Sequence, residues 1–329
     1  MSEKPSNNLF LSVVLTFFNE QDILPVLVDR LRKTMRGLIE KGKIGKYEMI
    51  FVNDDSSDDS EKKLFSLAEN NDDIRIINMS RNFGMAECLM AGMEYATGDA
   101  VVYMATDLQD PPEVIPEMIQ AWQEGQDIDV VNTVRTSRSG EPAFKMFLTK
   151  IGYRILHTMT DIKHPIEVSE FKLLSRRATE YLLMMREKKP FIRGLVCWIG
   201  FKQVFVPYHR EPRHSGESKF PIFGPRVFWD FLESALISFS SIPLKIMVAI
   251  GSVVSFFAFL MVCYVFLQKL IIPDVTHGWT TIMAVMLLLG GLQILSLGIV
   301  GLYVNIIFIE AKGRPRHIVK ETLGFPDTQ

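Results

Sequence analysis

Short apolar runs alternate with longer amphipathic stretches along the first third of the chain. The runs occupy residues 10–16, 47–52, 74–78 and 99–104. Between them, apolar positions recur at helical spacing in residues 21–41, 58–70 and 84–97. Apolar runs of this length are typical of buried strands. Strands that alternate with helices usually form a parallel sheet covered on both faces, so the pattern predicts an α/β domain.

A further helix is predicted to begin after the fourth apolar run. Asp110 has the position of an N-cap residue, and Pro111 and Pro112 follow in the first turn. Glu113 comes three residues after the cap, as in a capping box. Beyond residue 135 the pattern is less regular, and residues 201–207 have the pattern of a later strand.

Two long stretches near the C-terminal end carry no charged side chain, namely residues 246–267 and 279–309. A helix needs about 20 apolar residues to cross a bilayer, so both stretches are long enough. The alternative is a pair of buried core helices, which are seldom free of charge beyond about 14 residues. The sequence therefore predicts two transmembrane helices.

The segment before the first stretch, residues 221–243, has aromatic residues and leucines at helical spacing. Arg226, Asp230 and Glu233 lie among them. This pattern predicts an amphipathic helix in the membrane interface. The alternative is a surface helix packed on the preceding domain.

Positive charge predicts the orientation in the membrane. Lys245 precedes the first span, a basic cluster follows the second, and the connecting loop holds only Lys269. Basic residues are enriched on the cytoplasmic side, so both termini are expected in the cytosol. The predicted organisation is a catalytic domain (1–220), an interfacial helix (221–243), two spans (244–270 and 279–309) and a cytosolic tail (310–329).

Composition excludes several classes of protein. The 329 residues carry a net charge of −2, which gives no footprint for nucleic acid. Cys88, Cys197 and Cys263 form no CxxC pair, so neither a disulfide framework nor a metal site of this kind is expected. The first ten residues lack the pattern of a signal peptide, which agrees with a cytosolic first domain.

Two acidic clusters follow predicted strands, at residues 53–59 and 107–110. Ligands of open α/β sheets bind at the carboxyl ends of the strands. Carboxylates that meet there suit Mg²⁺ or Mn²⁺, which would bridge protein carboxylate to substrate phosphate and neutralise a departing diphosphate. The alternative is that these residues form turns and cap helices.

A third polar cluster, residues 209–220, combines cations and histidines around Gly216 just before the predicted interfacial helix. Arginine and lysine are the usual ligands of phosphate. Such a basic segment can also be attracted to anionic lipid. Both roles are compatible with one another.

Eight segments together carry a family resemblance: SVVLTFFNE (12–20), YEMIFVNDDSSDDS (47–60), SRNFGMAECLMAGMEYATGDA (80–100), DLQDPPEVIPEMI (107–119), EFKLLSRRA (170–178), FIRGLVCWIGF (191–201), GESKF (216–220) and RPRHIVK (314–320). They resemble segments of the GT-A-fold family 2 glycosyltransferases that act on polyisoprenyl phosphates. That group includes bactoprenol glucosyltransferases and, more distantly, dolichol-phosphate mannose synthases. The resemblance implies a GT-A (Rossmann-like) domain followed by the membrane helices.

The resemblance also implies roles for individual residues. Those implied to contact the nucleotide sugar and its cation are Glu20, Asn53, Asp54, Asp107 and Gln109, with Asp107 as the metal ligand. Those implied to hold the acceptor phosphate are Arg210, Arg213, Ser218 and Lys219. The implied catalytic residues are Asp107, Glu170, Arg213 and Lys219, with Glu170 as a candidate base or metal-side residue.

Several positions depart from the family pattern. Ala105 stands where the D-x-D motif usually begins, and Asp55 stands where glycine is usual. Residues 169–172 read Ser-Glu-Phe-Lys in place of Gly-Asp-Phe-Arg. Met85 replaces a common lysine and Leu302 a common glutamate.

The resemblance implies inverting transfer of one sugar, with UDP-glucose as the favoured donor, to a polyisoprenyl phosphate at the cytosolic face of the inner membrane. Mg²⁺ or Mn²⁺ is the expected cofactor and membrane lipid an expected partner. Lone spans often associate, so a homo-oligomer is compatible with the sequence. The alternative is a catalytically weak or inactive relative that binds nucleotide sugar or lipid phosphate as a scaffold, which Ala105 favours.

Overall fold

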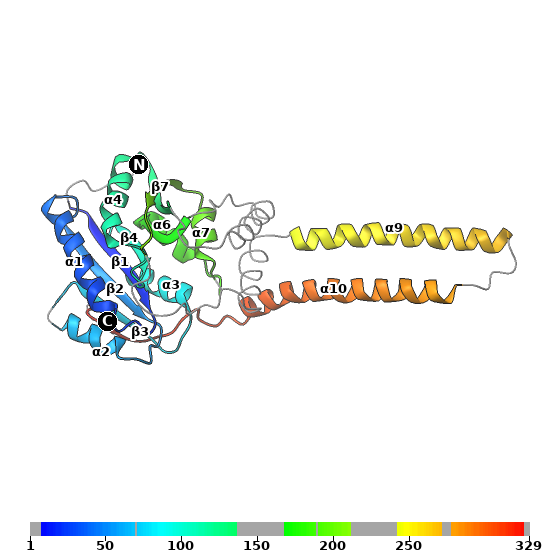
Figure 1. Ribbon diagram of the computed structural model, residues 1–329, viewed down its shortest axis with the longest axis horizontal. Coiled ribbons are helices and arrows are strands. Elements are labelled where there is room, and N and C mark those ends of the chain that lie inside the picture. Colours follow the sequence, from blue (N-terminus) through cyan, green and yellow to red (C-terminus); the bar gives the residue numbers. More distant parts are fainter. Residues whose placement is uncertain are drawn as a thin grey trace. The chain divides into compact units, whose positions relative to one another are not determined.

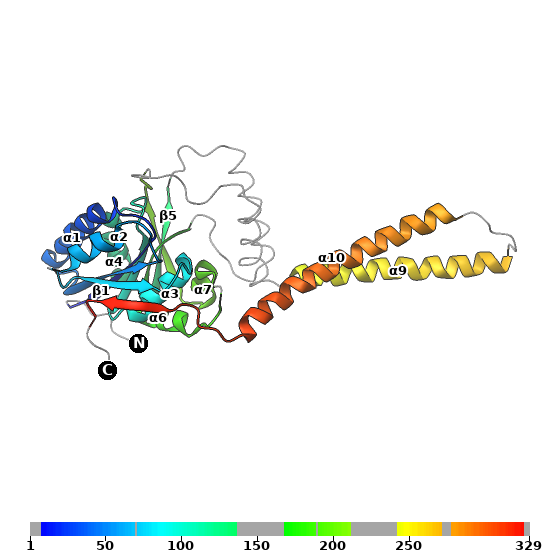
Figure 2. The ribbon, with the colours of Figure 1, turned by 90° about the horizontal axis from the view of Figure 1, so that it is seen from below.

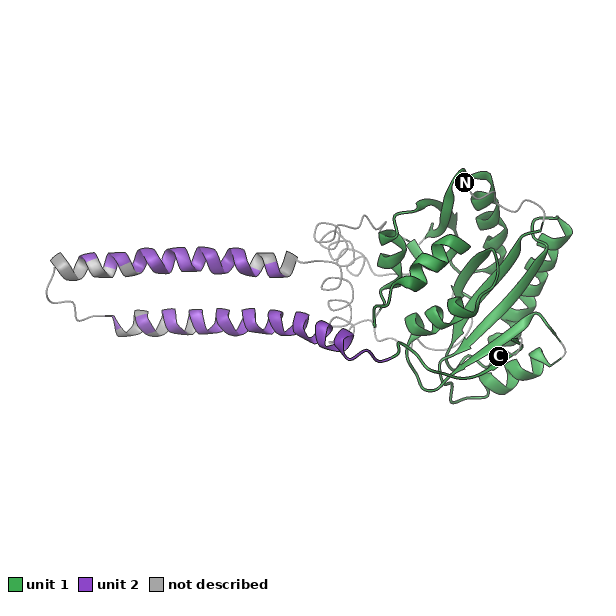
Figure 3. Cartoon of the chain, turned by 180° about the vertical axis from the view of Figure 1, so that it is seen from behind, with its two compact units in different colours: residues 1–155, 162–223, 315–329 green, residues 156–161, 224–314 purple. Residues whose placement is uncertain are grey.

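The computed structural model describes residues 8–69, 71–136, 168–188, 190–211, 242–271 and 278–325. The chain divides into two compact units (Figure 3). The first, called here the sheet domain, comprises residues 1–155, 162–223 and 315–329. The second, called here the helix pair, comprises residues 156–161 and 224–314.

The sheet domain (Figure 1) is built on a sheet that has eight strands among the described residues, in the order β7-β5-β6-β4-β1-β2-β3-β8. Its strands are β1 (Phe10–Phe17), β2 (Lys46–Asn53), β3 (Ile74–Met79), β4 (Ala100–Ala105), β5 (Ile128–Arg135), β6 (Val168–Ser175), β7 (Lys202–Tyr208) and β8 (Val319–Leu323). The four strands predicted in the first third are β1 to β4, and the later predicted strand is β7. The α/β class predicted from the sequence is thereby confirmed.

The sheet is mixed, whereas the sequence predicted a parallel one. β1 pairs parallel with β2 and with β4, and β2 pairs parallel with β3. β6 lies antiparallel between β4 and β5, and β8 adds antiparallel to the edge of β3. These two strands join the sheet from distant parts of the chain, which the local pattern of apolar residues cannot reveal.

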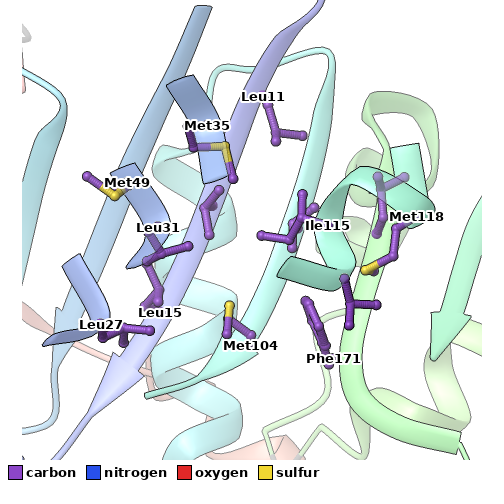
Figure 4. Packing of buried hydrophobic residues seen from close by; sticks show 14 of the residues in the cluster. Leu11, Leu15, Leu27, Leu31, Met35, Met49, Met104, Ile115, Met118 and Phe171 are labelled. Carbon is purple, nitrogen blue, oxygen red and sulfur yellow. The ribbon is translucent and has the colours of Figure 1, made fainter. Parts of the chain in front are cut away.

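Helices cover both faces of the sheet. The apolar sides of α1 (Leu24–Glu40), α2 (Ser60–Ala68) and α4 (Ile115–Glu124) pack on one face. Figure 4 shows the contact of Leu27, Leu31 and Met35 of α1 with the strands of this core. The other face carries α3 (Met85–Tyr95), α6 (Arg176–Met184) and α7 (Ile192–Trp198) (Figure 2).

Helix α3 approaches the sheet closely because one residue at the contact is glycine. A Cβ atom at Gly92 would lie 2.4 Å from Val14 Cγ1 and 3.0 Å from Val52 Cγ2. Any side chain there would push α3 away from β1 and β2. The loop that precedes α3 would move with the helix, and that loop belongs to the candidate site.

The predicted N-cap at Asp110 is wrong. A 3-10 turn, η1 (Pro112–Val114), comes first, with Pro111 as its N-cap and no capping hydrogen bond from a side chain. The carboxylate of Asp110 instead accepts a hydrogen bond from the Tyr208 hydroxyl on β7. The Asp110 carboxylate thus binds a hydroxyl 98 residues away in sequence, in place of the nearby backbone amides that a helix cap would bind.

The helix pair consists of α9 (Ile242–Ile271) and α10 (Trp279–Ala311). Residues Leu288–Ala311 of α10, with a mean hydropathy of 2.2, are long and apolar enough to cross a membrane. In α9 the corresponding described stretch, Met247–Met261, is shorter. One predicted span is therefore supported by length and composition, and the second stays a prediction. The predicted interfacial helix lies almost wholly outside the described residues, apart from Ile242 and Pro243 at the start of α9.

A buried carboxylate ties the amino ends of the parallel strands together. Glu48 of β2 is 1% exposed, forms an ion pair with Arg75 of β3 and accepts a hydrogen bond from the Ser12 hydroxyl of β1. It also accepts hydrogen bonds from the Thr97 amide and hydroxyl, at 2.9 and 3.1 Å, just before β4. Arg75 in turn lies under the Phe325 ring, 5.2 Å from its centroid, beyond β8.

Replacement of Glu48 by alanine is predicted to destabilise the sheet domain strongly. The change leaves Arg75 without its buried partner and deprives Ser12 and Thr97 of their acceptor, at a cost of about 3 kcal/mol or more. This corresponds to a melting temperature lower by roughly 6–12 °C, measured by differential scanning fluorimetry in detergent. The control is Glu117→Ala on the exposed side of α4. Equal melting temperatures for the two variants would show that the Glu48 network contributes no stability.

Candidate functional site

The carboxyl ends of β1 and β4 form the point at which the strand order reverses. From β1 the chain builds the sheet through β2 and β3 in one direction and through β4 in the other. Ligands of open α/β sheets bind at such a point, beyond the carboxyl ends of the strands. The loops that follow β1, β2, β3 and β4 all emerge at this edge, because these four strands are parallel.

The loop after β4 carries Asp107 and is held against β1. Ala105 pairs in register with Thr16, and the Thr106 hydroxyl donates to the Thr16 carbonyl at 3.1 Å. Leu108 has a φ of 57°, in the left-handed region that costs energy for a residue of this kind. Its side chain is buried in the core, while Asp107 and Gln109 on either side stay half-buried.

Asp107, Gln109 and Arg210 are brought together. The Gln109 amide donates to Asp107 Oδ1 at 3.2 Å, and the Gln109 side-chain oxygen accepts from Arg210 Nη2. The Glu211 amide donates to the Gln109 carbonyl at 3.0 Å. Arg210 Nε is buried and has no hydrogen-bond partner among the described residues. Residues predicted from two separate segments thus form one contiguous group, with an unpaired donor inside it.

Asp110 lies beneath this group in a buried polar cluster. Burial raises the pKa of Asp110, while the Tyr208 hydroxyl and Arg135 oppose the rise. The Tyr208 hydroxyl also lies 3.1 Å from Ser169 Oγ on β6. Tyr208 and Arg135 were not predicted as site residues, because nothing local to either of them indicates this contact.

Asp54, predicted to contact the nucleotide, shapes the loop after β3. Its carboxylate accepts from the amides of Phe83 at 2.7 Å and Gly84 at 3.0 Å, where α3 begins. Burial raises the pKa of Asp54, and these amides together with the Cys88 thiol oppose the rise. The next residue, Asp55, has a φ of 61°. Glycine adopts this conformation without strain, which accounts for the family's glycine at this position.

Asn53 and Glu20 occupy the neighbouring loops. Asn53 is buried, with its side-chain amide 3.0 Å from Asn78 Oδ1 and its oxygen accepting from the Ser56 amide. Glu20 is half-buried, and its backbone amide donates to Ser60 Oγ at 2.8 Å. In the described structure these contacts join the loops after β1 and β2 to one another and to β3.

Glu170 lies on β6, on the face of the sheet covered by α3, α6 and α7. One carboxylate oxygen pairs with Arg193 of α7, and the other is buried without a hydrogen-bond partner among the described residues. The Tyr103 hydroxyl is buried in the same way, and burial, with Glu170 nearby, raises the Tyr103 pKa. Lys172 is fully buried, donates to Asn132 Oδ1 at 2.9 Å, and has its pKa lowered by burial to about 8.

Within the described residues no hydrogen bond or ion pair joins Glu170 to the group around Asp107. The predicted acceptor residues Arg213, Ser218 and Lys219 lie outside the described part of the chain. Their predicted roles therefore stay predictions.

A divalent cation would find one suitable carboxylate at the edge formed by β1 and β4. No cluster of three or more His, Cys, Asp or Glu side chains suited to a metal occurs among the described residues. Mg²⁺ commonly uses only one or two protein carboxylates, and substrate phosphates and water complete its shell. Half-buried Asp107, which accepts one hydrogen bond on Oδ1, fits this mode of binding.

Comparison with known proteins agrees with the motifs. Residues 12–183 match the model of the family described as "Glycosyl transferase family 2". The chain is 37% identical to "Uncharacterized glycosyltransferase sll0501" of Synechocystis sp., over 95% of this chain and 96% of that protein. It is 38% identical to "Uncharacterized glycosyltransferase YkcC" of Bacillus subtilis, over 97% and 96% of the two chains.

A third relative has a more specific name. "Prophage bactoprenol glucosyl transferase homolog" of Escherichia coli is 33% identical, over 94% of this chain and 98% of that protein. The family predicted from the motifs is thus confirmed. A domain-length family match, full-length relatives and a polar group at the switch point of the sheet lead to one conclusion: the chain belongs to glycosyl transferase family 2 and is a glycosyltransferase.

Proposed function

We propose that this glycosyltransferase moves a single sugar from a nucleotide sugar onto a polyisoprenyl phosphate, with UDP-glucose as the favoured donor. The observation that carries the proposal is the group formed by Asp107, Gln109 and Arg210 at the carboxyl ends of β1 and β4. It combines a carboxylate suited to a cation with a guanidinium suited to phosphate. The name of the prophage relative supports glucose and a bactoprenol acceptor.

The reaction is a single inverting displacement. An acceptor phosphate oxygen forms a bond to the anomeric carbon as the bond to the nucleoside diphosphate breaks. A phosphate monoester is largely ionised at neutral pH, so a strong general base is dispensable. The protein then contributes alignment of the two substrates and stabilisation of the charge on the leaving group.

Each site residue has a task in this proposal. Asp107 would hold Mg²⁺ or Mn²⁺, and the cation would neutralise charge on the departing diphosphate. Gln109 orients Arg210, whose buried Nε has no hydrogen-bond partner among the described residues and would pair with an acceptor oxygen that reached it. Arg213, Ser218 and Lys219 complete the acceptor site, and Glu170 lies on the metal side or serves as a base. Glu20, Asn53 and Asp54 shape the loops that receive the nucleotide.

The acceptor lipid requires a membrane location. We propose that α9 and α10 both span the inner membrane, with the sheet domain and both termini in the cytosol. The length and composition of Leu288–Ala311 support one of these spans directly. The basic residues that follow α10 support the orientation. Association of helix pairs into a homo-oligomer is compatible with this arrangement.

Ala105 favours a second candidate function. It occupies the first position of the usual D-x-D motif and offers no ligand to a cation. A catalytically weak relative would bind nucleotide sugar or lipid phosphate without turnover and act as a scaffold.

A donor panel distinguishes the two candidates. The full chain, purified in detergent, is incubated with undecaprenyl phosphate, Mn²⁺ and radiolabelled UDP-glucose, other UDP-sugars or GDP-mannose. The proposal predicts one labelled sugar per lipid, released by mild acid. Substrate binding without labelled lipid for any donor would favour the scaffold, and a labelled polymer would contradict single transfer.

Replacement of Asp107 by asparagine is predicted to lower kcat/KM by roughly ten- to a hundredfold, since a contact to a charged group contributes about 1.5–3 kcal/mol. Ala105→Asp, which supplies a second carboxylate, should lower the Mn²⁺ concentration that gives half-maximal activity. The matched control is Asp72→Asn, an exposed residue before β3 at the opposite edge of the sheet. Unchanged rate and Mn²⁺ dependence in Asp107→Asn would remove this residue from the metal site.

The topology is tested by labelling engineered cysteines in intact cells. The native cysteines are first replaced, and Thr276→Cys or Lys320→Cys is then introduced. A reagent that cannot cross the membrane should label Thr276→Cys and leave Lys320→Cys unlabelled until the cells are opened, because positive charge is retained inside. The reverse pattern would show that the orientation is wrong.

A further inference from the structure

One guanidinium on α1 joins two glutamates that are distant in sequence. Arg30 binds Glu113 through Nε at 2.9 Å and Nη2 at 2.6 Å. It binds Glu211 through Nη1 and Nη2, both at 3.0 Å. Arg30 thus makes a forked contact with each carboxylate, the geometry in which arginine is most specific.

Both glutamates belong to segments that carry the candidate site. Glu113 lies in η1, directly after the loop that begins with Asp107, and Glu211 directly follows Arg210. The Glu211 amide also donates to the Gln109 carbonyl at 3.0 Å, next to the contact between the side chains of Gln109 and Arg210. Arg30 therefore binds both segments that form the site, and within the described structure its side-chain hydrogen bonds go to these two glutamates rather than to Asp107, Gln109 or Arg210.

The positive charge of Arg30 neutralises the two carboxylates of Glu113 and Glu211. Hydrogen bonds from Glu113 and Glu211 raise the pKa of Arg30, and Arg30 lowers the pKa of Glu113 against the opposing effect of burial. Removal of Arg30 would leave two carboxylates facing one another across the gap. Their repulsion would push Glu211, and Arg210 with it, away from the loop of Asp107.

The Nε atom of Arg210 is buried without a hydrogen-bond partner among the described residues. An unpaired buried donor is costly, and such groups are rare. A phosphate oxygen that entered beside Gln109 would satisfy it. That hydrogen bond forms only if the Arg210 backbone is correctly placed, and the contacts of the neighbouring Glu211 control this placement.

We infer that Arg30 is a positioning residue for the acceptor phosphate: through Glu211 it holds Arg210 against Gln109 and beside Asp107. The inference rests on the proposed function, in which Arg210 binds that phosphate. Arg30 contributes alignment rather than bulk stability, because half-exposed ion pairs are worth little to the fold.

The same helix supplies a matched control. Arg32, two residues along α1, makes a forked pair with Asp73 at 2.9 and 2.8 Å. This pair is more buried than those of Arg30 and lies at the amino end of β3, at the opposite edge of the sheet. Arg32→Ala therefore removes an equivalent interaction that is remote from the site.

The experiment compares Arg30→Ala, Glu211→Gln, their double variant and Arg32→Ala in the full chain in detergent. The readouts are melting temperature, KM for undecaprenyl phosphate, KM for the nucleotide sugar, and the dissociation constant of farnesyl phosphate by calorimetry. Arg30→Ala should raise the acceptor KM and the farnesyl phosphate dissociation constant about five- to tenfold, which is within the range of coupling energies between neighbouring residues. The donor KM should change less than about twofold.

The other variants, together with Arg30→Lys, make the assignment specific. Glu211→Gln removes one of the two carboxylate charges, so it should raise the acceptor KM less than Arg30→Ala does. The double variant should be no worse than Arg30→Ala, because it loses the same contact and lacks one of the two repelling carboxylates. Arg30→Lys, which keeps the charge but loses the double fork, should be intermediate. Arg32→Ala should lower the melting temperature alone.

Equal acceptor KM and farnesyl phosphate affinity in Arg30→Ala and the unmodified chain would overturn the inference, as would additive losses in the double variant. Binding of farnesyl phosphate by the unmodified chain, weakened in Arg30→Ala but without sugar transfer to any lipid, would support the positioning role and refute the proposed function. A chain that binds no farnesyl phosphate would refute both.

Discussion

The pairing of β1 with β4 places the loop after β1 beside the loop after β4, although β2, β3 and the helices between them separate the two loops in sequence. Thr16 lies opposite Ala105, and one hydroxyl-to-carbonyl bond from Thr106 carries the contact past the ends of the strands. Parallel strands end at a common edge, so this single register decides which residues can meet a ligand together. The position of Asp107 depends on it, and the contacts of Gln109 and Arg210 depend on the position of Asp107.

Polar side chains, rather than regular structure, hold the loops at this edge. Asp54 binds the amides at the start of α3, and the Asn19 side chain accepts from the Ser57 amide at 2.8 Å. Leu108 and Asp55 adopt left-handed backbone conformations. Strain of this kind persists only where the surrounding structure enforces it, and it is frequent at functional sites. The acidic residues after β2 therefore shape the site as well as offering charge to it.

The segment after α10 belongs to the sheet domain, although it follows the helix pair in sequence. After α10 the chain returns to the sheet domain, where Arg316 donates to the Met185 carbonyl at 2.9 Å and β8 pairs with β3. The Asn78 side chain, bound to Asn53 on one side, donates to Glu321 at 3.1 Å on the other. The segment that follows the apolar helix is thus part of the sheet on which the loops after β1, β2 and β3 are built.

The sequence by itself determined the elements whose cause is local. Continuous apolar runs identified β1 to β4, an unbroken apolar stretch identified α10, and a motif placed Asp107 and Gln109 just beyond a strand. The tertiary structure alone decided the partners. Asp110 has the local pattern of a helix cap, yet a buried tyrosine hydroxyl 98 residues away takes its carboxylate. Arg30 has the pattern of a solvated helix residue, yet it joins segments 83 and 181 residues distant. The tertiary structure likewise decided where the antiparallel strands β6 and β8 pair. They add to the outer sides of β4 and β3, which have no other neighbour there in the described structure. A hydrogen bond or ion pair depends on distance in space, and one sequence reports distance only along the chain.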